Sequence, residues 1–257
     1  MRIGFRFKLV PFIATVLLVA LGIALGNWQE RRAAEKIALE HKLALGNAAA
    51  PFMLGAAPLD PAANLYRRVA VTGEFVRGWP LYLENRPYQD RVGFYLLMPF
   101  KIAGTDMHVL VARGWLPRNS AQREQLPPYQ TPQGTVTIVG TVKLNAGHVM
   151  QLGSAPPLTP GAIVQNADVA QVIAASGLQL QPFVLEQSTS SATGAAATLM
   201  PAGAVADGDD GLLREWPAPA LGVERNRGYA FQWYGLALMA FLFFVLNGFR
   251  RGKDRAN

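Results

Sequence analysis

Two long runs without a charged residue bracket this chain of 257 residues. The first covers residues 9–29 and the second covers residues 228–249. A helix needs about 20 apolar residues to cross the hydrocarbon core of a bilayer, so both runs are long enough. A lone strand facing lipid would leave its backbone groups without hydrogen bonds, so each run is predicted to be a transmembrane helix.

The basic residues in excess sit on the two short tails. The net charge is +7, but residues 27–227 hold seventeen Lys or Arg against sixteen Asp or Glu. The tail residues are Arg2, Arg6 and Lys8 before the first run, and Arg250, Arg251, Lys253, Arg255 and the acidic Asp254 after the second. Positive residues flanking membrane spans favour the cytoplasmic side. Both termini are therefore expected in the cytoplasm, and no nucleic-acid partner is expected because the central region has no basic stripe.

These patterns predict an integral membrane protein of five segments. They are a cytoplasmic tail at 1–8, a transmembrane helix at 9–28, a periplasmic domain at 29–227, a second transmembrane helix at 228–249 and a cytoplasmic tail at 250–257. A cleaved signal peptide is the alternative for the first run, since 24–26 reads Ala-Leu-Gly, but the run exceeds a usual signal core. The N-terminus lacks a long Arg- and Ser-rich leader, which favours a bacterial inner membrane over a mitochondrial one.

Between the spans the chain is expected to be α+β, with an antiparallel β-sheet or small β-barrel and short helices. Helical spacing continues out of the first span and is predicted to end near Gly46. Runs rich in β-branched and aromatic residues, separated by turn signals, predict strands. They lie at 66–76, 81–86, 92–102, 107–116, 134–144 and 181–187. A short helix is predicted at 168–176, and a flexible loop at 188–211, where small and polar residues show no periodicity.

Few residues of this chain suit catalysis. There is no cysteine, which excludes disulfides and thiolate chemistry. The three histidines, His41, His108 and His148, lack the spacing of metal ligands, and no nucleophile elbow or phosphate-binding glycine loop is present. The chain is therefore not expected to be an enzyme, and no metal site is predicted.

Aromatic and polar residues gather where both spans meet the same membrane surface. Trp28 and Gln29 end the first run, and Tyr229, Gln232 and Trp233 begin the second. The spans run in opposite directions, so both groups face the outer side. One interpretation is an aromatic belt that anchors the helices at the headgroups. The other is a site for a cofactor or a partner helix, because buried amides require hydrogen-bond partners.

Helical spacing predicts which residues of the second span share a face. Asn226, Tyr229, Trp233 and Leu236 follow each other at intervals of three and four residues, so they are predicted to lie on one side of the helix.

Several segments, taken in order, resemble the Surfeit locus protein 1 family. GNWQERRAAEK fits its G-x-W-Q-x-x-R-x-x-x-K signature at Gly26, Trp28, Gln29, Arg32 and Lys36. RRVAVTGEF, LYLENR and VGFYLLMPF are similar to its first strands, VLVARGWLP to its R-G-W-x-P element, and GYAFQWYGLA to its Y-A-x-Q-W entrance to the second span. The resemblance covers nearly the whole chain and fails mainly at 188–211.

The resemblance implies a role in making haem–copper (cytochrome c) oxidase rather than catalysis. It implies subunit I of the oxidase and other assembly factors as partners, and haem a as a cofactor. The residues it points to are a haem-edge cluster of Trp28, Gln29, Arg227, Tyr229, Gln232 and Trp233. The family pattern places its proposed haem ligand, a histidine, where this chain has Asn226. Asparagine is not a usual haem ligand, so that role is not carried over.

Some residues have a plain structural interpretation beside the functional one. Arg225 and Arg227 either pair with haem propionates or mark the headgroup boundary. Arg86 and Arg113 are expected to form salt bridges or to cap backbone carbonyls, and Trp115 is expected in the core. Turn or bulge positions are predicted for Gly73, Gly93 and Gly114. The alternative function is that of a membrane-anchored scaffold for another envelope complex, without a cofactor.

Overall fold

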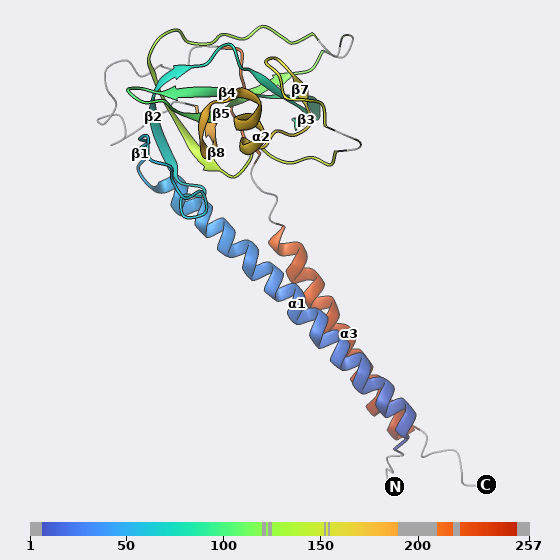
Figure 1. Cartoon of the computed structure of the whole chain (residues 1–257). Coiled ribbons are helices and arrows are strands. Elements are labelled where there is room, and N and C mark those ends of the chain that lie inside the picture. The colour runs from blue at the N-terminus through green and yellow to red at the C-terminus, as the bar shows by residue number, and fades with distance from the viewer. Residues whose placement is uncertain are drawn as a thin grey trace, which may run out of the picture. The chain divides into compact units, whose positions relative to one another are not determined.

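The computed structural model describes residues 7–119, 122, 125–151, 153, 155–189, 210–217 and 222–250 (Figure 1). Contacts divide the chain into two units. One comprises Met1–Lys42 and Pro219–Asn257, and the other comprises Leu43–Ala218. Most of the loop predicted at 188–211 lies outside the described residues.

The first unit is built from two long helices. Helix α1 spans Leu9–Ala48 and α3 spans Val223–Arg250, and they lie side by side (Figure 1). Both are long and apolar enough to cross a membrane, and only 11% of the most apolar window of each is buried. A core helix of a soluble protein would be mostly buried, so this exposure fits helices that face lipid. Helix α1 continues without a break to Ala48, two residues beyond the predicted end near Gly46.

The second unit is a curved sheet with one short helix, α2 at Val169–Ser176. Its strands are β1 (Phe52–Met53), β2 (Arg68–Phe75), β3 (Leu81–Tyr88), β4 (Arg91–Ile102), β5 (Met107–Pro117), β6 (Val136–Lys143), β7 (Ile163–Val164) and β8 (Gln179–Gln187). Six of them coincide with the predicted runs. Strands β1 and β7 were not predicted, because two residues are too few to show a period.

Five strands close into a ring, which confirms a small barrel. The order β2-β6-β8-β5-β4 is completed by a second pairing of β4 with β2. The antiparallel pairing that was predicted holds for the other ring pairs but not for β5 and β8, which pair in parallel. Directions cannot alternate around a ring with an odd number of strands, so at least one neighbouring pair must be parallel. The short strands β1 and β7 add parallel pairs to β2 and β3.

The barrel buries one apolar face inside and another beneath α2. Alternate residues of β4 enter the two clusters: Phe94 and Leu96 join the first, whereas Tyr95 and Leu97 join the second. A strand directs successive side chains to opposite faces, so the long apolar run of β4 serves both. The first cluster takes residues from all five ring strands, and the second includes Val172 of α2. The prediction that Trp115 lies in the core is confirmed. Its side chain is buried, and its Nε1 donates to the Arg86 carbonyl at 2.9 Å.

Gly73, Gly93 and Gly114 of the barrel do not share one structural reason for being glycine. Gly114 lies beside a register shift between β4 and β5, as a bulge position would. Gly73 and Gly93 do not lie at turns, because both are paired within strands. A Cβ at Gly73 would clash with the carbonyl group of Lys101, where β2 crosses β4 to close the ring. The prediction of a turn or bulge was therefore wrong for Gly73, where close backbone approach is the reason for glycine. Gly93 pairs with Arg86 directly beside the register shift between β3 and β4, as a position next to a bulge would.

Candidate functional site at the polar edge of the two helices

Small residues bring α1 and α3 into close contact. Gly22 and Gly26 are buried, one helical turn apart, against the face of α3 that carries Ala230 and Ala237. A Cβ added at Gly22 would lie 2.9 Å from the Cβ of Ala237, and one at Gly26 would overlap the ring of Tyr234. Spacing of small residues by four is a common way for membrane helices to approach each other, because lipid gives no hydrophobic force between them.

A chain of hydrogen bonds joins the two helices next to this contact. The ammonium group of Lys36 donates to the Asn226 side-chain oxygen at 2.6 Å. The Asn226 side-chain nitrogen donates to the Gln29 side-chain oxygen at 2.6 Å. We call Lys36, Asn226 and Gln29 the amide clamp. Further along, the Tyr234 hydroxyl donates to the side chain of Asn27 at 2.8 Å, so a second polar contact crosses the same pair of helices.

Of the three residues of the amide clamp, Gln29 was a predicted site residue and Asn226 was predicted as the position of the missing ligand, whereas Lys36 was not assigned to the site. Gln29 was expected to need a partner, and Asn226 is that partner. Lys36 was noted only as part of a signature. The sequence feature that could have assigned Lys36 to the site is its spacing from Gln29. Gln29, Ala33 and Lys36 follow intervals of four and three residues and therefore share a face of α1.

The remaining predicted site residues do not gather around the clamp. The side chains of Trp28 and Tyr229 are each 47% exposed, and Arg227 and Gln232 are exposed as well. Of the predicted face of α3, Asn226 bonds to α1, and Trp233 and Leu236 line a groove shared with α1, whereas Tyr229 is exposed. The face that packs on α1 instead follows Asn226, Ala230, Trp233 and Ala237.

Trp233 lines an apolar groove of about 380 Å³ between the helices. Its other walls are Leu18, Leu21, Gly22, Leu236, Met239, Ala240 and Phe243. This groove holds no charged side chain, so it suits an apolar occupant such as a lipid chain or the side chains of a further helix.

The residues of this edge do not fit axial haem ligation at Asn226. The amide oxygen of Asn226 already accepts from an ammonium group, and its nitrogen donates to Gln29. An amide nitrogen is a donor without a free lone pair, and haem iron is held in proteins by His, Cys, Met or Tyr. The clamp therefore uses the Asn226 side chain to join the two helices, so this side chain offers no ligand to haem iron.

In the barrel, the two predicted arginines are buried, and their terminal nitrogens are engaged in structural bonds. Arg113 lies 3.2 Å from the carboxylate of Asp210, which also pairs with Arg214. Burial lowers the pKa of Arg113 to about 10, while the charge of Asp210 opposes this fall. Arg86 donates to the carbonyls of residues 84, 147 and 165. The salt-bridge and backbone-capping interpretations are thus both confirmed.

Comparison with known proteins decides the family. The SURF1 family profile matches residues 16–238, which include most of α1, the whole barrel and half of α3. The chain belongs to the SURF1 family.

The individual relatives of this SURF1 family member align with only part of the chain, at identities near 30%. Surfeit locus protein 1 of Rattus norvegicus is 30% identical over 143 residues, covering 50% of this chain and 46% of the rat protein. The SURF1-like protein of Monosiga brevicollis is 32% identical over 142 residues, covering 51% of each chain. The SURF1-like protein of Drosophila melanogaster is 28% identical over 190 residues, covering 66% of this chain and 61% of the fly protein. The aligned region thus spans about half the length of the first two relatives.

Proposed function

We propose that this SURF1 family member is a membrane-bound assembly factor for haem–copper oxidase that assists the maturation of subunit I and is not an enzyme. The observation that carries the proposal is the family match, which runs through both apolar helices and the barrel rather than through one motif. Its partners on this proposal are subunit I, other assembly factors and membrane lipid.

The two helices support a chaperone of membrane segments. Their apolar surface is mostly exposed, and the groove under Trp233 is open to a further apolar surface. On this proposal, the apolar helices of subunit I are the surface that meets this helix pair. The helix pair, held together by its small residues and by the amide clamp, offers them a fixed surface.

The proposed location is a bacterial inner membrane, with both termini in the cytoplasm and the barrel in the periplasm. The support is the distribution of charge, because the basic residues in excess lie on the two tails. Haem a is the cofactor that the family implies, and its binding is also a proposal. The absorption spectrum of the purified protein tests it, and Asn226→His tests whether the edge accepts haem once a ligand is supplied.

Deletion of the gene tests the assembly role. We expect membranes of the deletion strain to lose most of their haem a absorbance and their mature subunit I, and to recover both with the wild-type gene. A respiratory complex without haem a serves as the control for general damage to the envelope. Normal oxidase activity in the deletion strain contradicts the proposal.

The alternative is a scaffold for another envelope complex, and the amide clamp is the observation that favours it. A clamp that only holds two helices together needs no cofactor. On this alternative the tagged protein co-purifies with envelope proteins other than oxidase subunits, and the haem a content of the membranes does not change on deletion.

A further inference from the structure

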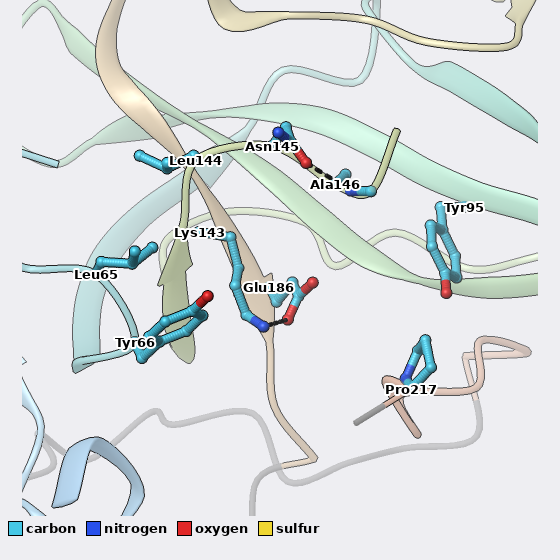
Figure 2. Close-up of a pocket in the computed structure, with 10 residues that line it drawn as sticks. Leu65, Tyr66, Tyr95, Lys143, Leu144, Asn145, Ala146, Glu186 and Pro217 are labelled. Carbon is cyan, nitrogen blue, oxygen red and sulfur yellow. Dashed lines mark hydrogen bonds and ion pairs between the residues drawn. The ribbon is translucent and has the colours of Figure 1, made fainter. Parts of the chain in front are cut away.

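The barrel unit carries a pocket that the assembly role does not use. Its volume is about 310 Å³ (Figure 2). Its walls come from the segment before β2, from β4, from the end of β6 and the turn after it, from β8 and from the segment after the barrel. The lining residues are Leu65, Tyr66, Tyr95, Lys143, Leu144, Asn145, Ala146, Gly147, Glu186 and Pro217.

A poorly hydrated ion pair lies in the middle of this pocket. The Lys143 ammonium is 3.2 Å from one oxygen of the Glu186 carboxylate, and only 21% and 13% of the two side chains are exposed (Figure 2). Burial raises the pKa of Glu186, and the nearby charge of Lys143 only partly opposes the rise. Among the described residues Lys143 is the one hydrogen-bonding partner of this carboxylate. The second oxygen is therefore available to a ligand.

Two tyrosines flank the ion pair on opposite sides (Figure 2). The ring of Tyr66 lies 5.0 Å from the Lys143 ammonium, a distance at which a cation is attracted to an aromatic face. Tyr66 has a φ of 69°, a left-handed backbone that is unfavourable for a bulky residue. Such strain persists only where the surrounding structure enforces it, and here it directs the ring to the pocket.

Tyr95 supplies a hydrogen-bond donor at the other side. Its ring is held edge-on against Trp216 at 5.0 Å, and the Arg86 guanidinium lies over it at 5.6 Å. The hydroxyl makes no hydrogen bond within the part of the chain that the structure describes. Burial and then the charge of Glu186 raise the pKa of Tyr95, so the hydroxyl keeps its proton and remains able to donate.

These groups match a cation on an apolar stem. A carboxylate with a spare oxygen and an aromatic face bind a basic head, while Leu65, Leu144 and Pro217 offer contact to methylene groups. An anion fits poorly, because the Lys143 ammonium already contacts both the Glu186 carboxylate and the Tyr66 ring, and the buried Arg86 is directed to backbone carbonyls.

We propose that this pocket binds an arginine or lysine side chain of a partner polypeptide, with the second oxygen of Glu186 as its counter-ion and Lys143 as the internal cation that competes for the same carboxylate. The Tyr95 hydroxyl donates to a carbonyl of the bound segment. This site is separate from the helix edge and does not depend on which membrane protein the chain helps to assemble.

Binding of short peptides to the full-length protein tests the proposal. The protein is placed in nanodiscs of zwitterionic phosphatidylcholine, so that a basic peptide gains nothing from the lipid. The probe is a fluorescent acetyl-Leu-Arg-Leu-amide, followed by anisotropy. The neutral control replaces arginine by citrulline, which has nearly the same shape, and the anionic control replaces it by glutamate. We expect the arginine peptide to bind about tenfold more tightly than either control.

Two variants that are expected to change the peptide affinity in opposite directions test the roles of Glu186 and Lys143. Glu186→Gln is expected to remove the preference for arginine, and Lys143→Met to raise the affinity because the internal competitor is gone. Glu74→Gln and Lys101→Met, which change exposed residues of the same barrel outside the pocket, are the matched controls and should change nothing. If Glu186→Gln does not fold, Leu144→Arg tests the same point from the exposed rim, where an added guanidinium should compete with the peptide and Leu144→Gln should not.

Three results would overturn the proposal. Equal binding of the arginine and citrulline peptides would show that charge is not recognised. Preference for the glutamate peptide, lost in Lys143→Met, would assign the pocket to anions. Absence of binding by every peptide would show that the ion pair is only structural.

Discussion

Asn226 is the single residue on which the interpretation of the helix edge depends. It stands where the family pattern has a histidine, and its amide is used on both sides. We predict that Asn226→Leu weakens the contact between α1 and α3 by about 1 kcal/mol, the usual size of a polar contact between membrane helices. Unfolding in sodium dodecyl sulfate, followed by tryptophan fluorescence, measures the change.

The partner residue makes this prediction sharper. Gln29→Leu and the double variant complete a cycle, and non-additive losses are expected because both changes break the same hydrogen bond. Asn247→Leu is the control, since that side chain bonds only to a carbonyl of its own helix among the described residues. Full additivity of the two changes would contradict the amide clamp.

Asp210 carries the charge balance of the barrel interior. It is the acidic partner of Arg113 and Arg214, whose side chains are 1% and 4% exposed. Asp210→Asn removes the carboxylate that pairs with both buried guanidinium groups, and we predict a loss of about 3 kcal/mol or more in the free energy of unfolding. Asp106→Asn, which removes a pair whose carboxylate is 95% exposed, is expected to change the same quantity by less than about 1 kcal/mol. Similar losses in urea unfolding of both variants would refute this account.

At the scale of elements, the two glycines of α1 set how closely the helices approach. Gly26 faces the ring of Tyr234, so Gly26→Leu must separate α1 from α3 and lengthen the bonds of the amide clamp. Gly235→Leu is the matched control, because no atom of the described residues lies within 4 Å of a Cβ added there. We predict that only the first variant is degraded faster in cells and unfolds at lower detergent concentration, and equal behaviour of both would contradict the packing.

The elements themselves were largely predictable because each has enough residues to show a period. The spans follow from uncharged apolar runs, and the six strands and α2 follow from alternation and helical spacing. The parallel pairing of β5 with β8 was not predictable, since it depends on the number of strands that close the ring. Spacing along α3 placed Tyr229 beside Asn226, but only the position of α1 decides which half of that helix is buried.

The same limit applies to the candidate sites. Gln29 and Asn226 lie 197 residues apart, and Lys143 and Glu186 meet only because β6 pairs with β8. A sequence shows which residue types are present but not which of them meet in the fold. The helix edge was predicted as a site because its residues resemble a family signature. The pocket of the barrel had no mark in the sequence, because its lining residues come from five separate segments.

For the whole molecule, the orientation in the membrane decides which partners the barrel can meet. The charge excess on the tails predicts that both termini lie on one side and the barrel on the other. The chain has no cysteine, so a single added thiol reports its own side. We predict that Asp106→Cys, an exposed position of the barrel, reacts with a membrane-impermeant maleimide in spheroplasts.

Asn257→Cys, at the last residue of the chain, is expected to react only after the membrane is permeabilised, because the tail that carries it follows a span with basic residues at its end. Neither change alters a basic residue of the tails, so the determinant of orientation is kept. A third variant, with Arg250, Arg251 and Lys253 all changed to Gln, weakens that determinant. If charge sets the orientation, this variant should show partial labelling of residue 257 in intact spheroplasts. Labelling of residue 106 only after permeabilisation would place the barrel in the cytoplasm, where the proposed site for a basic segment would meet a different set of partners.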